Sequence, residues 1–421
     1  MKVMLHGAAY RLARALGLTS SAATSRNGVV TQAATAIAET TPCDARLVDW
    51  QGRRLNLLLP SINAHHYFGG IHTAVQLYRA LEKHFPATRI VLVDSAPDIA
   101  ALKRFGDHTL VDCADDSNAS RQIVPFNDRY GRTLPVGAGD CWLTTAWWTT
   151  YAAQRLAAWQ QRQFGTAGRL TNLIQDFEPG FYPWSSQFAL ALGTYRPNQD
   201  VAVFNTRLLA DYFDLQGIAY QRSFVFEPTL NDGLRQALAD ARVSLQPRHR
   251  RLVVYARPST PRNAFELLCE ALRIWGWSDP ASAHWEVVAA GELTEDLDLG
   301  PFTLRALGKL SLQDYANLLS TSAVGVSLMV SPHPSYPPLE MAAFGMAVVT
   351  NQFANKDLAC FSENIHSAEY FSPESIADSI TREVRAWEDR QMRAVSLMSK
   401  GHSFLAEGGF EKLAERLVLL S

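Results

Sequence analysis

Residues 329–351 read Met-Val-Ser-Pro-His-Pro-Ser-Tyr-Pro-Pro-Leu-Glu-Met-Ala-Ala-Phe-Gly-Met-Ala-Val-Val-Thr-Asn, and they predict a strand, a loop, a helix and a second strand. The apolar run at 323–330 is the first strand, and a proline-rich loop follows it. A short helix then carries one carboxylate, Glu340, near its start and ends at Gly345, and residues 346–350 form the second strand. Loops between a strand and a helix N-terminus bind anions and sugar hydroxyls in α/β folds, so this stretch predicts both a fold class and a ligand site.

The same alternation of short strands and helices extends over two halves of the chain. In the first half we expect strands at 55–60, 90–93, 141–145, 170–174 and 201–204, and helices at 71–81, 151–163 and 207–213. After a polar stretch we expect strands at 251–256, 285–290 and 303–306, and helices at 261–274 and 312–319. Such alternation indicates parallel, doubly wound sheets. The sequence therefore predicts an α/β fold with Rossmann-like domains at about 46–230 and about 248–400, after a leader at 1–45 and before a terminal helix within 405–421.

The composition of the 421-residue chain narrows the class of protein. Hydrophobic residues make up 47% and charged residues 19%, which is ordinary for a soluble globular protein. The net charge of −2 argues against a nucleic-acid partner. Five scattered cysteines favour free thiols in a reducing cytoplasm over a disulfide framework or a zinc site. No apolar run reaches the ~18 residues that a membrane span needs.

The leader differs from the rest of the chain. Residues 1–38 contain four basic residues and no acid, and residues 10–18 are compatible with a small basic amphipathic helix. Such a helix would touch a membrane surface weakly, whereas a leader rich in Ala, Thr and Ser is often poorly ordered. We favour the poorly ordered leader because the apolar face is small, and a peripheral contact with the inner membrane stays open.

Two patterns that resemble metal motifs do not predict a metal site. Adjacent histidines, His65 and His66, make a poor chelate without further ligands. Asp296 and Asp298 form an Asp-x-Asp pattern, but they lie in a polar turn and are interpreted as solvated. We therefore expect no bound metal.

The proline-rich loop supplies the first group of candidate site residues. Glu340 follows two prolines near a helix start, where the helix dipole and free N–H groups would stabilise a carboxylate. His333 is placed to bond a sugar or a diphosphate, and Ser335, with its N–H, to cradle phosphate beside Tyr336. The simpler alternatives are that Glu340 caps its own helix and that His333 is a loop histidine held by prolines.

Basic residues after the strands of the second half form a second group. Arg257 follows the strand at 251–256, and Arg262 comes five residues later. Arginine suits bidentate phosphate contacts, and a cation at a helix N-terminus needs a compensating anion, so we expect both to bind phosphate. Lys309 precedes the helix at 312–319 and is either a ligand-binding group or an ordinary surface lysine.

The first half supplies further candidates for a phosphate- or sugar-binding site. Gly69 and Gly70 lie between the first strand and the first helix, where glycines let the backbone approach a phosphate or a sugar. Asp176 and Glu178 end a strand and precede several aromatic residues, a pattern typical of carbohydrate sites, and Asp176 is the leading candidate for a catalytic carboxylate. Trp147 leaves another strand and either lines a groove for a sugar substrate or packs in the core.

These segments resemble GT-B glycosyltransferases, and more closely the WsaF-type rhamnosyltransferases of bacterial surface-glycan assembly in glycosyltransferase family 4. The matching stretches are 174–183 (IQDFEPGFYP), 255–263 (YARPSTPRN) and 331–351, within most of 55–360. The sequence departs from the usual family 4 pattern of Glu, seven residues, Glu, because Pro332 occupies the first of these positions and only Glu340 remains.

The resemblance implies two Rossmann-like domains whose parallel sheets face each other across a cleft, with the terminal helix packed back on the first domain. It implies dTDP-β-L-rhamnose as the donor substrate, no cofactor and no metal, and a rhamnose-containing glycan or lipid-linked glycan as the acceptor. Glu340 would bind the ribose, Arg257 and Arg262 the diphosphate, and Lys309 would lie near the base. A retaining reaction follows from the family alone.

Several alternatives remain open. The donor would be a UDP- or GDP-hexose if the resemblance misleads about the nucleotide. An inverting reaction would follow if Asp176 acts as a general base. From another class, a non-catalytic GT-B-like scaffold that binds glycan is motivated by the missing first Glu. The acceptor, the linkage and the oligomeric state are not determined by the sequence.

Overall fold

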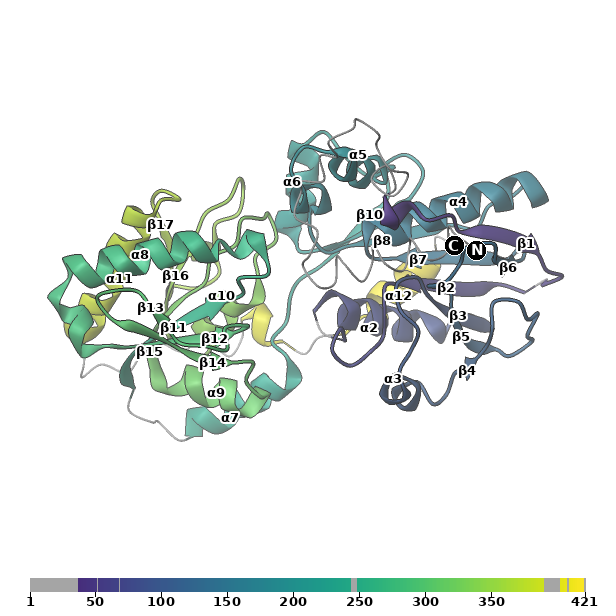
Figure 1. Ribbon diagram of the computed structural model, residues 1–421. Helices are drawn as coiled ribbons and strands as arrows, with labels where there is room; N and C mark the ends of the chain where they lie inside the picture. Colours follow the sequence, from purple (N-terminus) through teal and green to yellow (C-terminus); the bar gives the residue numbers. More distant parts are fainter. Residues whose placement is uncertain are drawn as a thin grey trace, which may run out of the picture.

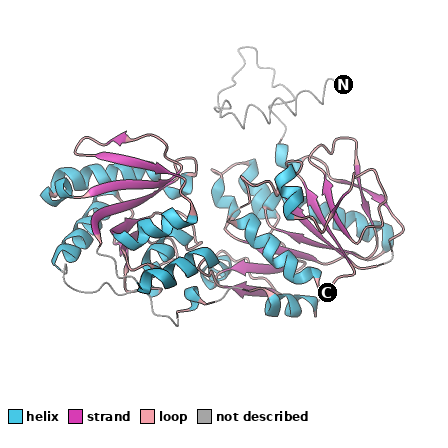
Figure 2. Ribbon diagram, turned by 90° about the horizontal axis from the view of Figure 1, so that it is seen from below, coloured by secondary structure: helices cyan, strands magenta, loops and turns pink. Residues whose placement is uncertain are grey.

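The computed structural model describes residues 37–50, 52–67, 69–243, 248–389, 402–406 and 409–419. It has two α/β domains, each built on its own sheet (Figure 1). Helices cover the sheets of both domains, as a second view also shows (Figure 2). The amphipathic helix considered at 10–18 lies outside the described residues.

The first domain is built on an eight-stranded parallel sheet with the order β10-β9-β8-β7-β2-β3-β5-β4. Its strands are β2 (Arg54–Leu59), β3 (Ala87–Leu92), β4 (Thr109–Leu110), β5 (Arg121–Pro125), β7 (Asp140–Thr144), β8 (Leu170–Ile174), β9 (Val201–Asn205) and β10 (Ser223–Phe226). β2 and β9 are buried throughout, as expected of parallel strands covered on both faces. A separate parallel pair joins β1 (Asp44–Leu47) to β6 (Thr133–Val136).

Helices connect these strands. They are α2 (Gly70–Glu82), α3 (Ile99–Arg104), α4 (Trp147–Phe164), α5 (Ser186–Gly193) and α6 (Arg207–Leu215), with 3₁₀ turns η2 (Ala38–Thr40) and η3 (Glu178–Phe181). The last helix of the chain, α12 (Glu411–Val418), packs against α2 and places Leu413, Ala414 and Leu417 in the core of the first domain. The Phe410 ring meets Phe226 edge to face, with 5.0 Å between centroids.

The second domain has a seven-stranded sheet with the order β13-β14-β12-β11-β15-β16-β17. Its strands are β11 (His249–Ala256), β12 (Glu286–Gly291), β13 (Leu297–Asp298), β14 (Thr303–Gly308), β15 (Ser322–Val326), β16 (Ala347–Asn351) and β17 (Ile365–Ala368). All pairs are parallel except β13 with β14. Its helices and 3₁₀ turns are α7 (Asp232–Val243), α8 (Phe265–Ser278), α9 (Leu312–Thr321), α10 (Tyr336–Ala343), α11 (Pro373–Asp389), η4 (Pro261–Asn263), η5 (Pro280–His284), η6 (Leu358–Cys360) and η7 (Ser403–Leu405).

Three of the differences from the sequence expectation concern the second domain. The strand expected at 323–330 ends at Val326, because farther along Met329 N donates to the Asn351 side chain and Val330 N to the Arg262 carbonyl instead of to a ladder partner. The helix expected at 261–274 is interrupted at Ala264, whose φ of 48° separates η4 from α8. The polar stretch after the first domain contains α7, which buries Leu234 and Leu238 in the core of the second domain.

Candidate active site

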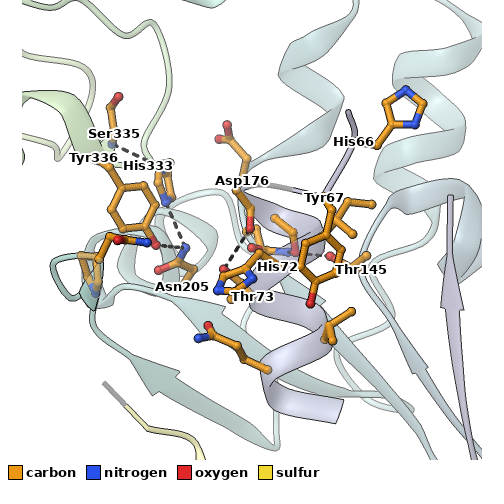
Figure 3. A pocket seen from close by; sticks show the side chains of 18 of the residues that line it. His66, Tyr67, His72, Thr73, Thr145, Asp176, Asn205, His333, Ser335 and Tyr336 are labelled. Atoms are coloured by element: carbon orange, nitrogen blue, oxygen red, sulfur yellow. Dashed lines mark hydrogen bonds between the residues drawn. The ribbon is translucent and has the colours of Figure 1, made fainter. Parts of the chain in front are cut away.

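The C-terminal ends of both parallel sheets open on one cleft, with a volume of about 1950 Å³. In the first sheet β2 is flanked by β7 and β3, and in the second β11 is flanked by β15 and β12, so the chain reverses its winding direction beside each central strand. Ligands of open α/β sheets bind in the crevice outside such switch points. Residues from both domains line the cleft, and Figure 3 shows part of its wall.

Asp176, just after β8, is the main polar contact of the first domain with the second. Its Oδ1 accepts hydrogen bonds from the Ser331 hydroxyl and, at 2.8 Å, from Phe177 N, and its Oδ2 lies 3.5 Å from Arg262 Nε. Asp176 is only 8% exposed. The guanidinium of Arg262 also lies over the Phe181 ring, 4.4 Å from its centroid. The structure thus brings both predicted residues together, but it pairs Arg262 with a carboxylate of the other domain.

His333 forms a second link between the domains. Its Nε2 lies 3.2 Å from the Asn205 side-chain amide, which also contacts the Tyr336 hydroxyl at 3.1 Å (Figure 3). Its Nδ1 accepts from Ser335 N at 3.1 Å. Burial lowers the pKa of His333 to about 4, although the charge of Asp176 acts in the opposite direction. His333 is therefore neutral at physiological pH.

The start of α10 offers few backbone donors to an anion. Pro337 and Pro338 have no N–H, and Ser335 N is engaged by His333. Ser335 adopts a φ of 68°, an uncommon conformation for a residue with a Cβ, and such strain is often found at functional sites. The expectation that the Ser335 N–H cradles phosphate does not match this contact, whereas the Ser335 side chain remains on the cleft wall.

Glu340 lies on the fifth residue of α10, one turn deeper than expected. The interpretation that free N–H groups at a helix start stabilise its carboxylate is wrong, since those groups belong to the first turn. Burial instead raises the pKa of Glu340 to about 7, while the Tyr315 hydroxyl acts in the opposite direction. Both side chains line the cleft.

Arg257 already has an anionic partner within the chain. Its Nε lies 3.0 Å from Glu292 Oε1, and Ser259 N donates to the other oxygen of Glu292 at 3.2 Å. Arg257 also precedes η4 instead of lying at the start of a long helix. The argument that its position demands an external anion is therefore wrong, although Arg257 and the exposed Lys309 both line the cleft.

On the first domain, the glycine loop lies at the cleft. Gly69 has a φ of 51° and begins α2, and a Cβ on Gly70 would come within 3.0 Å of Gln175 Nε2. Gln175 Nε2 donates to the Gly70 carbonyl at 2.8 Å and to the Thr145 hydroxyl at 2.7 Å, so it joins the ends of β7 and β8 to α2. A larger residue at Gly70 would displace this bridge.

Glu178 lines the cleft, but Trp147 does not. Glu178 Oε2 accepts from Trp147 N at 2.5 Å, and burial raises the pKa of Glu178 to about 8 despite this hydrogen bond. Trp147 is 1% exposed and donates its ring N–H to the Tyr182 hydroxyl at 2.9 Å. The expectation that Trp147 lines an acceptor groove is wrong, because its ring is buried in the core. Its neighbour Trp148 lines the cleft instead.

Sequence reasoning missed two site residues. Thr206 caps α6 by accepting from Leu209 N, which leaves the side chain of the preceding Asn205 for His333. Lys356 is 1% exposed, and its Nζ donates to the Met329 carbonyl at 2.6 Å. Burial lowers the pKa of Lys356 to about 7, and Asp176 acts in the opposite direction. The sequence signal for Asn205 is its place at the end of β9, and Lys356 lies after β16 within the family-like stretch that continues beyond residue 351.

The described residues contain no group of three or more His, Cys, Asp or Glu side chains arranged to hold a metal. Asp296 and Asp298 instead accept backbone N–H groups of Ala306 and Gly300, each at 2.8 Å. Within the same part of the chain, no helix is long and apolar enough to cross a membrane.

Comparison with known proteins places these features in a family. Residues 54–207 match the model of the WsaF N-terminal domain, and residues 250–381 match that of the WsaF C-terminal domain. The O-antigen biosynthesis protein RfbC of Myxococcus xanthus is 30% identical over 313 residues, which cover 72% of this chain and 22% of that protein. The chain thus spans about a fifth of the length of this curated relative.

Solved structures show the fold. Sucrose-phosphate synthase from Thermosynechococcus elongatus aligns with a TM-score of 0.54 at 14% identity over 87% of this chain and 98% of that one. Anabaena HepE in complex with UDP aligns with a TM-score of 0.54 at 10% identity over 87% and 99%. The predicted GT-B fold is confirmed by these likenesses and by the two parallel sheets.

Proposed function

The chain belongs to the WsaF family, and from this membership we propose that it is a glycosyltransferase that moves L-rhamnose from dTDP-β-L-rhamnose to a bacterial surface glycan. The observation that carries the proposal is the cleft at the switch points of both sheets, where the proline loop of the second domain meets Asp176 and Asn205 of the first. A donor held by the second domain would there face an acceptor held by the first.

The nucleoside diphosphate would lie on the second domain. Glu340 and Tyr315 suit the free 3′-hydroxyl of the deoxyribose, and Arg257, Lys309 and the Ser335 hydroxyl suit the diphosphate, because all five side chains line the same cleft. Since the start of α10 has few backbone donors, side-chain cations would supply most of the charge that stabilises the departing dTDP. This assignment supports a reaction that needs neither a cofactor nor a metal.

The sugar and the acceptor would meet at the link between the domains. We assign Asp176 and His333 as the catalytic residues, His333 as a neutral hydrogen-bonding group beside the donor sugar and Asp176 as the carboxylate that orients the acceptor hydroxyl. The oxygens of Asp176 are engaged by Ser331, Phe177 N and Arg262, so the acceptor would replace one of these partners. Gly69, Gly70 and Glu178 would line the acceptor side.

The acceptor would be a glycan or a lipid-linked glycan. The Myxococcus xanthus relative is named as an O-antigen biosynthesis protein, which supports a surface polysaccharide. We propose a retaining reaction from the family pattern. Pro332 stands in place of the first Glu of that pattern, and the anomeric configuration of the product, read by NMR, tests whether the reaction retains configuration.

A thermal-shift screen with dTDP, UDP and GDP tests the donor. We expect dTDP to raise the melting temperature most. A larger shift with UDP would favour a UDP-hexose donor, as the UDP bound to HepE suggests for a protein of the same fold. No shift with any nucleotide, together with no hydrolysis of any nucleotide sugar, would favour the non-catalytic scaffold.

A further inference from the structure

The surface around α5 is unusually apolar. Trp184 is 94% exposed, Phe181 38% and Leu192 36%, and the Phe188 ring lies 6.4 Å from that of Trp184. Ala191 is the single buried residue of α5, so the helix contributes little to the core. Soluble monomers expose large apolar residues singly more often than in a group, and a group marks an interaction site.

The charges around this surface have one sign. Residues 179–195 contain no charged side chain. Across 141–199 the two acids are Asp176, which is buried, and Glu178, which is held by Trp147 N, whereas Arg155, Arg162 and Arg196 are exposed. The next helix, α6, carries acids of its own, so the positive character is confined to the arginines of α4 and to Arg196, which follows α5.

These two helices lie on the same side of the first sheet (Figure 1). They are also joined directly, because Gln154 Nε2 of α4 donates to the Thr194 carbonyl at the end of α5 at 2.8 Å. The apolar residues of η3 and α5 and the arginines of α4 therefore come from neighbouring elements on this side of the sheet. This surface continues into the cleft, since Phe181 lines it and stacks with Arg262.

We propose that this surface, formed by η3, α5 and the exposed arginines of α4, docks on the anionic surface of a lipid bilayer. Exposed Trp, Phe and Leu side chains flanked by arginines are the combination that inserts into the headgroup region of anionic membranes. An anionic bilayer complements the exposed arginines. The two acids of this segment, Asp176 and Glu178, are buried or hydrogen-bonded and do not repel it. Docking in this orientation would bring the mouth of the cleft, at Phe181, next to the membrane.

Flotation of the full chain with vesicles tests the proposal. We expect binding to vesicles of phosphatidylglycerol and phosphatidylcholine in equal parts, and much weaker binding to phosphatidylcholine alone. Trp184→Ser combined with Leu192→Ser should lower the partition coefficient about tenfold, because two inserted apolar side chains are lost. Arg155→Ala combined with Arg196→Ala should weaken binding to the anionic vesicles and reduce its dependence on salt.

Trp277→Ser is the matched control. Trp277 is 75% exposed on α8 of the second domain, so its replacement removes a similar side chain from another surface and should leave the partition unchanged. All replaced side chains are exposed, and an unchanged melting temperature verifies that each variant folds.

Three results would overturn the proposal. Vesicle binding that survives the Trp184/Leu192 replacement would assign the contact to another segment, such as the basic residues before position 38. A dimer in light scattering that this replacement dissociates would identify a second copy of the chain as the occupant. If the chain binds no vesicles and the Trp184/Leu192 replacement lowers activity only on a lipid-linked acceptor, the occupant of this surface is the lipid of the acceptor. The flotation measurement contains no donor or acceptor, so its outcome is independent of the proposed reaction.

Discussion

Ser331 of the second domain donates a hydrogen bond to Asp176 of the first, although 155 positions separate them in the chain. The same carboxylate faces Arg262, whose own carbonyl accepts from Val330 N beside Ser331. One acidic side chain of the first domain thus holds two segments of the second, η4 and the proline loop. The relative position of the domains, and with it the shape of the cleft, depends on this contact.

Ser331→Ala should loosen the contact between the domains. The buried Asp176 loses a donor, and the cost in the free energy of unfolding is expected to be about 1–3 kcal/mol. The same variant should raise the KM for the donor more than it lowers kcat, because the arrangement of the two domains that binds the donor becomes less populated. Ser379→Ala is the control, since Ser379 is equally buried but donates only within α11. Equal effects of both variants would contradict the special role of Ser331.

Arg257→Ala should abolish dTDP binding in calorimetry, because it removes a cation from the proposed diphosphate site. Arg305→Ala is matched to it, since Arg305 also pairs with a glutamate at the second sheet, at 2.9 Å from Glu286 Oε1, but lies outside the cleft lining. Unchanged dTDP affinity of Arg257→Ala would refute the phosphate assignment.

His333→Gln should flatten the pH dependence of stability between pH 6.5 and 4. The pKa of His333 is lowered to about 4 in the folded chain, so the unfolded chain binds more protons in this range. The free energy of unfolding therefore decreases as the pH is lowered from 6.5 to 4. The difference between wild type and variant should change by roughly 3 kcal/mol over this range. Urea unfolding at several pH values measures it. His284→Gln, at an exposed position, should leave the slope unchanged, and an unaltered slope in His333→Gln would show that the ring titrates normally.

Asp140→Ala should destabilise the first domain strongly. Arg54 Nε and Nη2 lie 2.7 and 2.8 Å from the two carboxylate oxygens, and Arg89 Nη2 lies 3.9 Å away, all with buried side chains. Removing the carboxylate leaves buried cations unpaired, at a cost of about 3–5 kcal/mol. Asp116→Ala, which breaks a solvent-exposed pair with Arg46, should have little effect. Similar losses in both variants would contradict this account.

The order of strands and helices could be predicted because each is a local pattern. Leu170–Ile174 is a short apolar run between polar segments, and its ends coincide with those of the expected strand. The strand Arg121–Pro125 was not predicted, since it begins with Arg and Gln and is held in the sheet by its neighbour β3. α7 was not predicted, because only two leucines mark its buried face within a polar stretch.

The candidate site was partly predictable for the same reason. Residues after parallel strands gather at one end of a sheet, so Asp176, Arg257 and His333 could be expected at the cleft without knowledge of their contacts. Partners were not predictable, because Glu292 for Arg257 and Asn205 for His333 come from other strands or from the other domain. Similarly, no local pattern distinguishes the buried Trp147 from Trp148 at the cleft.

The nucleotide released from a panel of donors tests the proposed function most directly. Wild-type protein is incubated with dTDP-β-L-rhamnose, UDP-hexoses and GDP-hexoses, with and without a rhamnose-containing acceptor, and the free nucleoside diphosphate is quantified. We predict that dTDP is released fastest, that the acceptor increases its release, and that Arg257→Ala reduces it to background. Faster turnover of a UDP- or GDP-hexose, or no turnover of any donor, would contradict the account.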